Sequence, residues 1–203
     1  LEVLPTPEKI IFFGLIPALI AIISSPIDTT SAPNPNFFIS LIKFTLVLDL
    51  IAKPESGGRY DSVYPGRRKP EILDMTLAEL YADMRKRARK HGSSASGRYQ
   101  YIRKTLIGVA KSMGLDPRKT KFTPEIQDKI VIYHLRLNHG LDRWMRGKTS
   151  DEDFLKRLSK TWAGLPKDMS GRSYYAGDKI GNKAGINYDT AMAALGNIRT
   201  AIG

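Results

Sequence analysis

The sequence predicts a mainly α-helical fold with one small β element. Apolar residues recur at helical spacing in several segments, and these segments are bounded by residues that favour helix ends. Residues 53–75, in contrast, are rich in Gly, Pro, Arg and Tyr and have no helical period. The chain has 203 residues and no cysteine, so its length must supply a stable core without disulfides. We therefore expect an α-rich domain with a small β element near residues 57–70.

The first predicted helix covers the apolar residues 37–52 and is expected to stop before Pro54. Thr76 and Glu79 are spaced as a capping box, which begins a helix that ends at His91 before a glycine. The remaining helices are expected at residues 98–113, at 123–137, from 150 onward and at 188–201, with a long Gly-rich loop over 166–186.

The first 36 residues differ in composition from the rest. Residues 10–23 are apolar and uncharged, but the run is shorter than the ~20 residues that cross a bilayer comfortably. Residues 24–36 are rich in Ser, Thr, Pro and Asn, which is typical of a linker. We therefore divide the chain into an extension over residues 1–36, acting as a docking segment, anchor or signal, and a catalytic domain over residues 37–203. Any contact with a membrane is expected at residues 9–23.

The net charge is +12, and it belongs to the catalytic domain. Residues 1–53 hold four acidic residues and three lysines, a net −1, so the remainder carries +13. This charge indicates an anionic partner, either nucleic acid or a bacterial wall rich in carboxylates and phosphates. No nucleic-acid docking motif accompanies it, so no specific nucleic acid is expected. Because His91, His134 and His139 lack the spacing of a helical zinc pair, we expect neither a metal nor a cofactor.

A glutamate directly follows the first apolar helix, in the sequence IAKPESGG at residues 51–58. Cleavage of a glycosidic bond needs a carboxylic acid that keeps its proton near neutral pH and donates it to the leaving oxygen. Partial removal from water at the end of an apolar helix raises the pKa of a carboxyl towards that range. Glu55 is therefore the candidate catalytic acid. The adjacent Ser56 is a candidate substrate-binding residue, or alternatively a residue that hydrogen-bonds near Glu55 or starts the turn. Taken alone, a glutamate beside glycines is more often an exposed loop residue.

A second segment, SSASGRYQYI at residues 93–102, is expected to be a small-residue turn that leads into a helix. Small residues can form the floor of a groove, while Tyr99 and Gln100 offer hydrogen bonds to acetamido and hydroxyl groups. Tyr174 and Tyr175 are candidates for stacking on sugars at the groove rim, or alternatively for holding their own loop in place.

Together these segments resemble the phage lysozyme-like family typified by the bacteriophage lambda endolysin. The matching pieces, in chain order, are IAKPESGGRYDSVYPG, SSASGRYQYIRKTL, FTPEIQDKIVIYHL, LSKTWAGLP and GRSYYAGD. SGRYQ and TWAGLP are the most specific, and the resemblance covers about residues 40–190. The order of the pieces is also similar to that of bacterial lytic transglycosylases.

The resemblance implies a two-lobed, lysozyme-like fold with a groove for alternating N-acetylglucosamine and N-acetylmuramic acid. It implies cleavage of the β-1,4 bond from muramic acid to glucosamine, with Glu55 acting first as acid and then as base. Lambda-like members close the muramic acid 6-hydroxyl onto C1, whereas a two-carboxylate hydrolase needs a second acid. Asp61 is the nearest candidate in sequence, although Tyr-Asp-Ser is also typical of a loop whose side chain bonds its own backbone. Both outcomes stay open.

Three biological settings follow from the resemblance. The first expectation is a virion-associated lysozyme of a tail or ejection apparatus, with residues 1–36 docked on other virion proteins. The second is an endolysin that lyses the host from its periplasm or cell envelope. The third is an inactive structural or wall-binding module of a virion. In each setting the expected partner is the peptidoglycan glycan strand.

Overall fold

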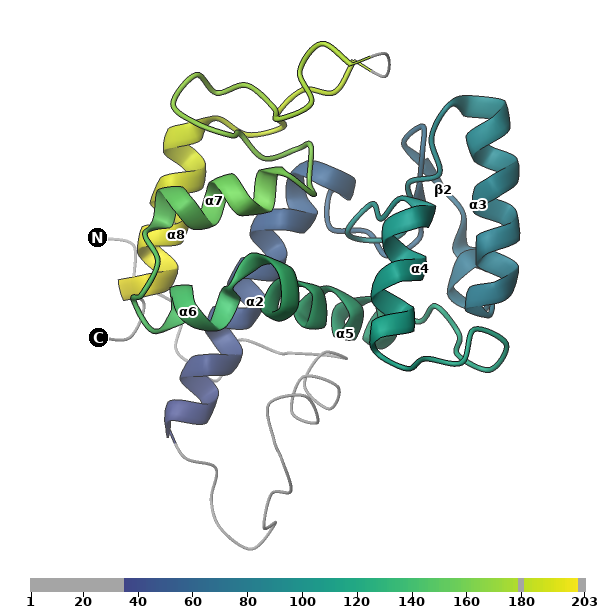
Figure 1. Cartoon of the computed structure of the whole chain (residues 1–203), viewed down its shortest axis with the longest axis horizontal. Helices are drawn as coiled ribbons and strands as arrows, with labels where there is room; N and C mark the ends of the chain where they lie inside the picture. The colour runs from purple at the N-terminus through teal and green to yellow at the C-terminus, as the bar shows by residue number, and fades with distance from the viewer. Residues whose placement is uncertain (1–34, 179–180, 201–203) are drawn as a thin grey trace, which may run out of the picture.

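A computed structural model describes residues 35–178 and 181–200 and is mainly helical (Figure 1). Its α-helices are α2 (Pro35–Ser56), α3 (Leu77–His91), α4 (Arg103–Ser112), α5 (Pro124–His134), α6 (Leu141–Met145), α7 (Asp151–Ser159) and α8 (Tyr188–Thr200). The shorter elements are the 3-10 turn η2 (Pro70–Leu73), the π-helical turn η3 (Leu135–His139) and an antiparallel pair of strands, β1 (Ser62–Val63) and β2 (Arg67–Arg68). The fold class predicted from the sequence is confirmed.

The roles in docking, anchoring or export were expected of residues 1–36, of which residues 1–34 lie outside the described residues, while Pro35 and Asn36 begin α2. Within the described ranges, no helix is both long enough and apolar enough to cross a membrane.

The helices form two lobes (Figure 1). The smaller lobe contains the β1–β2 hairpin, α3 and α4, and the larger lobe contains α6, α7 and α8. Helices α2 and α5 run between them: α2 packs against α5 and α8, and α5 also packs against α4. The end of α2 therefore comes to lie between the lobes.

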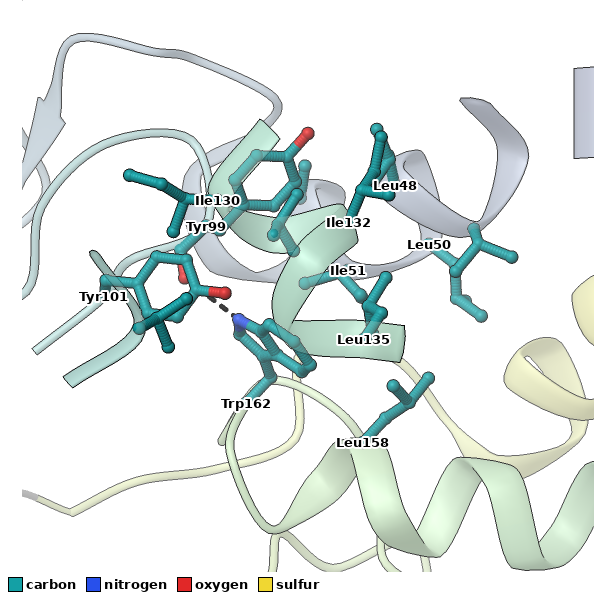
Figure 2. Close-up of a cluster of buried hydrophobic side chains, with 14 of the residues drawn as sticks. Leu48, Leu50, Ile51, Tyr99, Tyr101, Ile130, Ile132, Leu135, Leu158 and Trp162 are labelled. Carbon is teal, nitrogen blue, oxygen red and sulfur yellow. Dashed lines mark hydrogen bonds between the residues drawn. The ribbon is translucent and has the colours of Figure 1, made fainter. Parts of the chain in front are cut away.

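The core of the larger lobe forms around one face of α2, which buries Val47, Leu48 and Ile51. Figure 2 shows Leu48 and Ile51 of this face beside the buried side chains of α5, η3 and α7. Trp162 lies at the edge of this cluster and is 2% exposed. Its indole N–H donates to the carbonyl oxygen of Tyr99 at 3.1 Å, which ties the larger lobe to the loop before α4 (Figure 2).

Most predicted helix ends are confirmed. Thr76 and Glu79 form a reciprocal capping box, and Gly92 closes α3 in the left-handed conformation with φ 83°. The hydroxyls of Thr123 and Ser150 cap α5 and α7 by accepting backbone N–H groups. The predicted β element is the β1–β2 hairpin.

The end of the first helix was predicted wrongly. Helix α2 does not stop before Pro54 but continues to Ser56. Proline removes the backbone donor at position 54 and distorts the helix there, but only Glu55 and Ser56 follow it in α2, so little of the helix is affected. The helix then ends at Gly57 and Gly58, both with positive φ, 63° and 80°.

The start of α4 was also predicted wrongly. The helix begins at Arg103, whereas residues 96–101 form a tight loop closed by a bridge between Ser96 and Tyr101. Gln100 has φ 44°, which is incompatible with a right-handed helix. The segment is held in this shape by buried contacts with residues distant in sequence, described below.

Candidate active site

Glu55 lines a cavity of about 450 Å³ between the two lobes. The end of α2 contributes Glu55 to this cavity, the smaller lobe contributes residues from 93–105, and the larger lobe contributes residues from 160–164 and 175–183. The predicted catalytic acid and the predicted small-residue turn are therefore parts of one cavity.

The environment of Glu55 suits a proton donor. Burial raises the pKa of its carboxyl from 4.5 to about 7, although a backbone hydrogen bond from Gly164 opposes the shift. In this bond the Gly164 N–H donates to Oε1 of Glu55 at 2.7 Å. A large fraction of the carboxyl is therefore protonated at neutral pH. Gly164 lies in the TWAGLP segment, but the residues around it give no indication of this contact.

Two glycines allow the chain to approach Pro54 and Glu55 closely. A Cβ atom at Gly164 would lie 3.0 Å from Oε1 of Glu55 and 3.0 Å from Cβ of Pro54. At Gly185 it would lie 2.9 Å from Cβ of Pro54. The two glycines are joined by a hydrogen bond from the Gly185 N–H to the Gly164 carbonyl at 2.8 Å. Two segments of the larger lobe thus hold the end of α2 in place without side chains.

Ser56 does not line the cavity. It is 5% exposed, and its hydroxyl donates to the carbonyl oxygen of Arg98 at 2.6 Å. The prediction that Ser56 binds substrate is therefore corrected: its side chain joins the end of α2 to the 96–101 loop. The reason is that Ser56 is still helical and lies on the buried side of α2.

Tyr99 and Gln100 differ in what they can offer a ligand. Tyr99 contributes to the cavity wall, but its side chain is 1% exposed and its hydroxyl donates to Oδ1 of Asp128 at 2.6 Å. Its predicted hydrogen bond to a sugar is therefore corrected, because a partner inside the protein uses the hydroxyl. Gln100 also lines the cavity, and its amide N–H groups donate to the carbonyls of Gly97 at 2.8 Å and Ser62 at 3.2 Å. Its amide oxygen is the group that it can present to a ligand.

The two tyrosines of the Gly-rich loop form an edge-to-face pair with their ring centroids 5.4 Å apart. Tyr175 lines the cavity, and its hydroxyl donates to the carbonyl oxygen of Lys160 at the end of α7. Tyr174 is 49% exposed and is not part of the cavity wall. Tyr175 thus both holds the loop and borders the cavity, whereas Tyr174 supports it from outside.

Asp61 does not lie in the cavity wall. It is 5% exposed and accepts a hydrogen bond from Nε of Arg68 at 2.7 Å, within the hairpin segment. The expectation of Asp61 as second carboxylate is therefore corrected. The carboxylate that does line the cavity with Glu55 is Asp178, at the end of GRSYYAGD. It accepts hydrogen bonds from the backbone N–H of Asn182 at 3.0 Å and from its amide group at 2.6 Å.

A buried polar network lies behind the 96–101 loop. The Arg98 guanidinium pairs with Asp49 of α2 and donates to the hydroxyl of Tyr60 at 2.9 Å. Tyr60 in turn donates to Oδ2 of Asp128 in α5 at 2.8 Å. Asp128 also accepts the Tyr99 hydroxyl, so one carboxylate joins three segments. The sequence carried one signal of this network that was not used, an aspartate within the apolar helix PEIQDKIVIYH.

Gln127, the neighbour of Asp128, fixes the backbone of the same loop. Its side-chain oxygen accepts the Arg98 N–H at 2.8 Å, and its amide nitrogen donates to the carbonyls of Tyr60 and Phe122 at 3.2 Å each. A Cβ atom at Gly97 would lie 2.4 Å from that side-chain oxygen, so the loop needs glycine there. These contacts explain why residues 96–101 do not continue into α4.

The sequence model of one family, described as Endolysin, matches residues 48–184. The match includes Glu55, both cavity walls and the buried network, and covers about two thirds of the chain. No match to a curated protein or to a solved structure was found. The family match favours host lysis over the virion-associated setting, which was the first expectation from the sequence. The chain belongs to the endolysin family, whose members are phage lytic enzymes that degrade bacterial peptidoglycan.

Proposed function

We propose that this endolysin cleaves the β-1,4 bond between N-acetylmuramic acid and N-acetylglucosamine, with Glu55 as the general acid and base. The observation that carries the proposal is the desolvated Glu55 carboxyl in the cavity between the lobes, with a pKa of about 7. In this range a carboxyl can donate a proton to a leaving oxygen and then take one from a nucleophile.

The hydrogen bond from the Gly164 backbone makes the two carboxyl oxygens of Glu55 different. Because Oε1 accepts the Gly164 N–H, the transferable proton is expected on Oε2. When the proton moves to the leaving oxygen, the carboxylate that remains keeps a hydrogen bond that stabilises its charge. Gly164 is thus a positioning residue that acts through Glu55.

We propose an intramolecular closure rather than hydrolysis. A conventional hydrolase needs a second catalytic carboxylate, and Asp178 is the other carboxylate in the described cavity wall. Because two N–H groups of Asn182 hold Asp178 within its own loop, we do not assign it that role. The 6-hydroxyl of muramic acid would therefore attack C1 while the C1–O bond to glucosamine breaks. Glu55 protonates the departing oxygen and accepts the hydroxyl proton, which leaves a 1,6-anhydro sugar and regenerates the acid. The product is one water lighter than a hydrolysis product, which mass spectrometry can distinguish.

Replacement of Glu55 by glutamine tests the proposal, because an amide of similar shape cannot donate the proton. We expect Glu55→Gln to lower the rate of glycan cleavage by about 10²–10⁴-fold while binding to the wall survives. Purified peptidoglycan and chromatography of the released muropeptides provide the measurement. Glu71→Gln, on the exposed surface of η2, is the matched control and should retain wild-type activity.

The pH dependence of the wild-type enzyme provides a second part of the same test. The active form of Glu55 is protonated, and its pKa is about 7. Activity should therefore decrease as the pH rises through about 7, by roughly tenfold per pH unit above it. A Glu55→Gln enzyme with substantial cleavage, or a wild-type rate that rises through this range, contradicts the assignment.

A further inference from the structure

The two walls of the Glu55 cavity differ in charge. The wall contributed by the smaller lobe presents neutral residues, among them Ser93, Gln100 and Thr105. The wall contributed by the larger lobe contains Lys160 and Lys183 together with Asp178. Formally charged side chains other than Glu55 therefore lie on one side of the cavity.

Both lysines are available to a ligand. Each is exposed, and neither ammonium has an ion-pair partner among the residues that the structure describes. The backbone next to each is fixed: the Lys160 carbonyl accepts the Tyr175 hydroxyl, and Asn182, before Lys183, is bound to Asp178. The wall thus combines an excess of positive charge with an anchored backbone.

We infer that Lys160 and Lys183 form a subsite for a carboxylate carried by the glycan strand. This inference rests on the proposed function and names what the cavity recognises beside the scissile bond. N-acetylglucosamine has no carboxylate, whereas muramic acid carries one either on its lactyl group or on the peptide stem attached to it. Because only one wall is cationic, it should bind muramic acid, which carries the carboxylate, in preference to the uncharged N-acetylglucosamine. It also sets the direction in which the strand passes Glu55.

Three forms of the same glycan distinguish the two sources of the carboxylate. In native strands the lactyl group is amide-linked and the stem peptides carry free carboxylates. In chemically amidated strands the stem carboxylates are neutral. In strands from which an amidase has removed the stems, the lactyl carboxylate is free. The variants are Lys160→Gln, Lys183→Gln and their combination. Lys156→Gln is the control, because Lys156 is exposed on α7 and does not line the cavity.

If the stem carboxylates are bound, the double variant should lose about 5–20-fold in kcat/KM on native strands, since one exposed ion pair contributes about two- to fivefold. It should match the wild type on amidated strands. If the lactyl carboxylate is bound, the loss should appear only on strands without stems. Either result supports the subsite, provided that Lys156→Gln behaves as the wild type.

An equal loss on all three substrates, or a loss on none, overturns the subsite. These outcomes are distinct from failure of the proposed function. If the wild-type enzyme releases no muropeptide from native strands, the assignment of the reaction fails, whatever the lysine variants do.

Discussion

A side chain at position 164 would crowd the Glu55 carboxyl. A Cβ atom there would lie 3.0 Å from Oε1, closer than nearly all real contacts of this kind. The same residue donates the backbone hydrogen bond that holds the carboxyl and lowers its pKa against the larger effect of burial. The position therefore influences both the orientation and the acidity of Glu55.

We expect Gly164→Ala to lower kcat by roughly tenfold or more, because small displacements of a catalytic group are costly. The substitution should also weaken the hydrogen bond from the backbone N–H of residue 164 to the Glu55 carboxylate. The pKa of Glu55 should therefore rise, and activity should begin to decline at a pH above 7. The pH dependence of kcat/KM measures this shift.

Gly108→Ala is the matched control for this substitution. A Cβ atom at Gly108, within α4, would have nothing within 4 Å. This variant should retain activity and gain roughly 1 kcal/mol of stability from its better helix propensity. A Gly164→Ala enzyme that behaves in the same way would show that the glycine does not position Glu55.

At the scale of elements, the π-helical turn η3 brings together two histidines that an α-helix would separate. His134 and His139 are five residues apart, and their rings lie 4.9 Å from each other. The Tyr101 hydroxyl contacts Nδ1 of His134, and the carbonyl of Arg157 contacts Nδ1 of His139, each at 3.0 Å. The pKa of both imidazoles is lowered from 6.5 to about 4, mainly by burial, and for His139 the neighbouring His134 contributes to the shift.

The stability of the fold should therefore decrease in mild acid. The unfolded chain takes up protons on these histidines near pH 6.5, whereas the folded chain excludes them until about pH 4. The histidine contribution is thus fully present above pH 6.5 and is lost as the pH falls towards 4. Thermal unfolding across this range measures the decline.

Replacing one of the two buried histidines by a side chain that does not titrate should make the loss of stability with falling pH less steep. His139→Gln tests this, and His91→Gln, at the end of α3 and outside the pair, is the control that should keep the wild-type slope. A melting temperature independent of pH over this interval would be incompatible with the two imidazoles being held neutral.

At the scale of the whole molecule, the Asp128 network joins the central helices α2 and α5 to the smaller lobe. Through Tyr60, Tyr99 and Arg98, the carboxylate connects α5 to the segment after α2 and to the loop of the cavity wall. Burial raises the pKa of Asp128, although the two tyrosine hydroxyls and Arg98 oppose the shift. Asp128 is 2% exposed, so its hydrogen bonds to these groups are shielded from water.

We expect Asp128→Ala to lower the free energy of unfolding by about 2–5 kcal/mol, because it leaves the hydroxyls of Tyr60 and Tyr99 without their acceptor inside the protein. Asp128→Asn keeps part of the hydrogen bonding and should cost less. The control is Asp142→Ala, which removes a partly exposed pair with Arg136 and should cost under about 1 kcal/mol. Urea unfolding measures all three, and equal losses for Asp128→Ala and Asp142→Ala would contradict the role of the network.

The sequence by itself determined the helical class, the capped ends of α3, α5 and α7, and the choice of Glu55 as candidate acid. These features depend on residues a few positions apart, such as Thr76 and Glu79, or on a carboxyl at the end of an apolar helix. Such short-range interactions can be read from spacing and residue type alone.

Only the tertiary structure decided which side chains reach the cavity. Ser56, Tyr99 and Asp61 have suitable chemistry, but partners within the fold use their polar groups. Gly164 and Lys183 border the cavity although nothing local marks them, since the contact from Glu55 to Gly164 spans 109 positions. Contacts of this kind depend on how the helices pack, which local residue patterns do not encode.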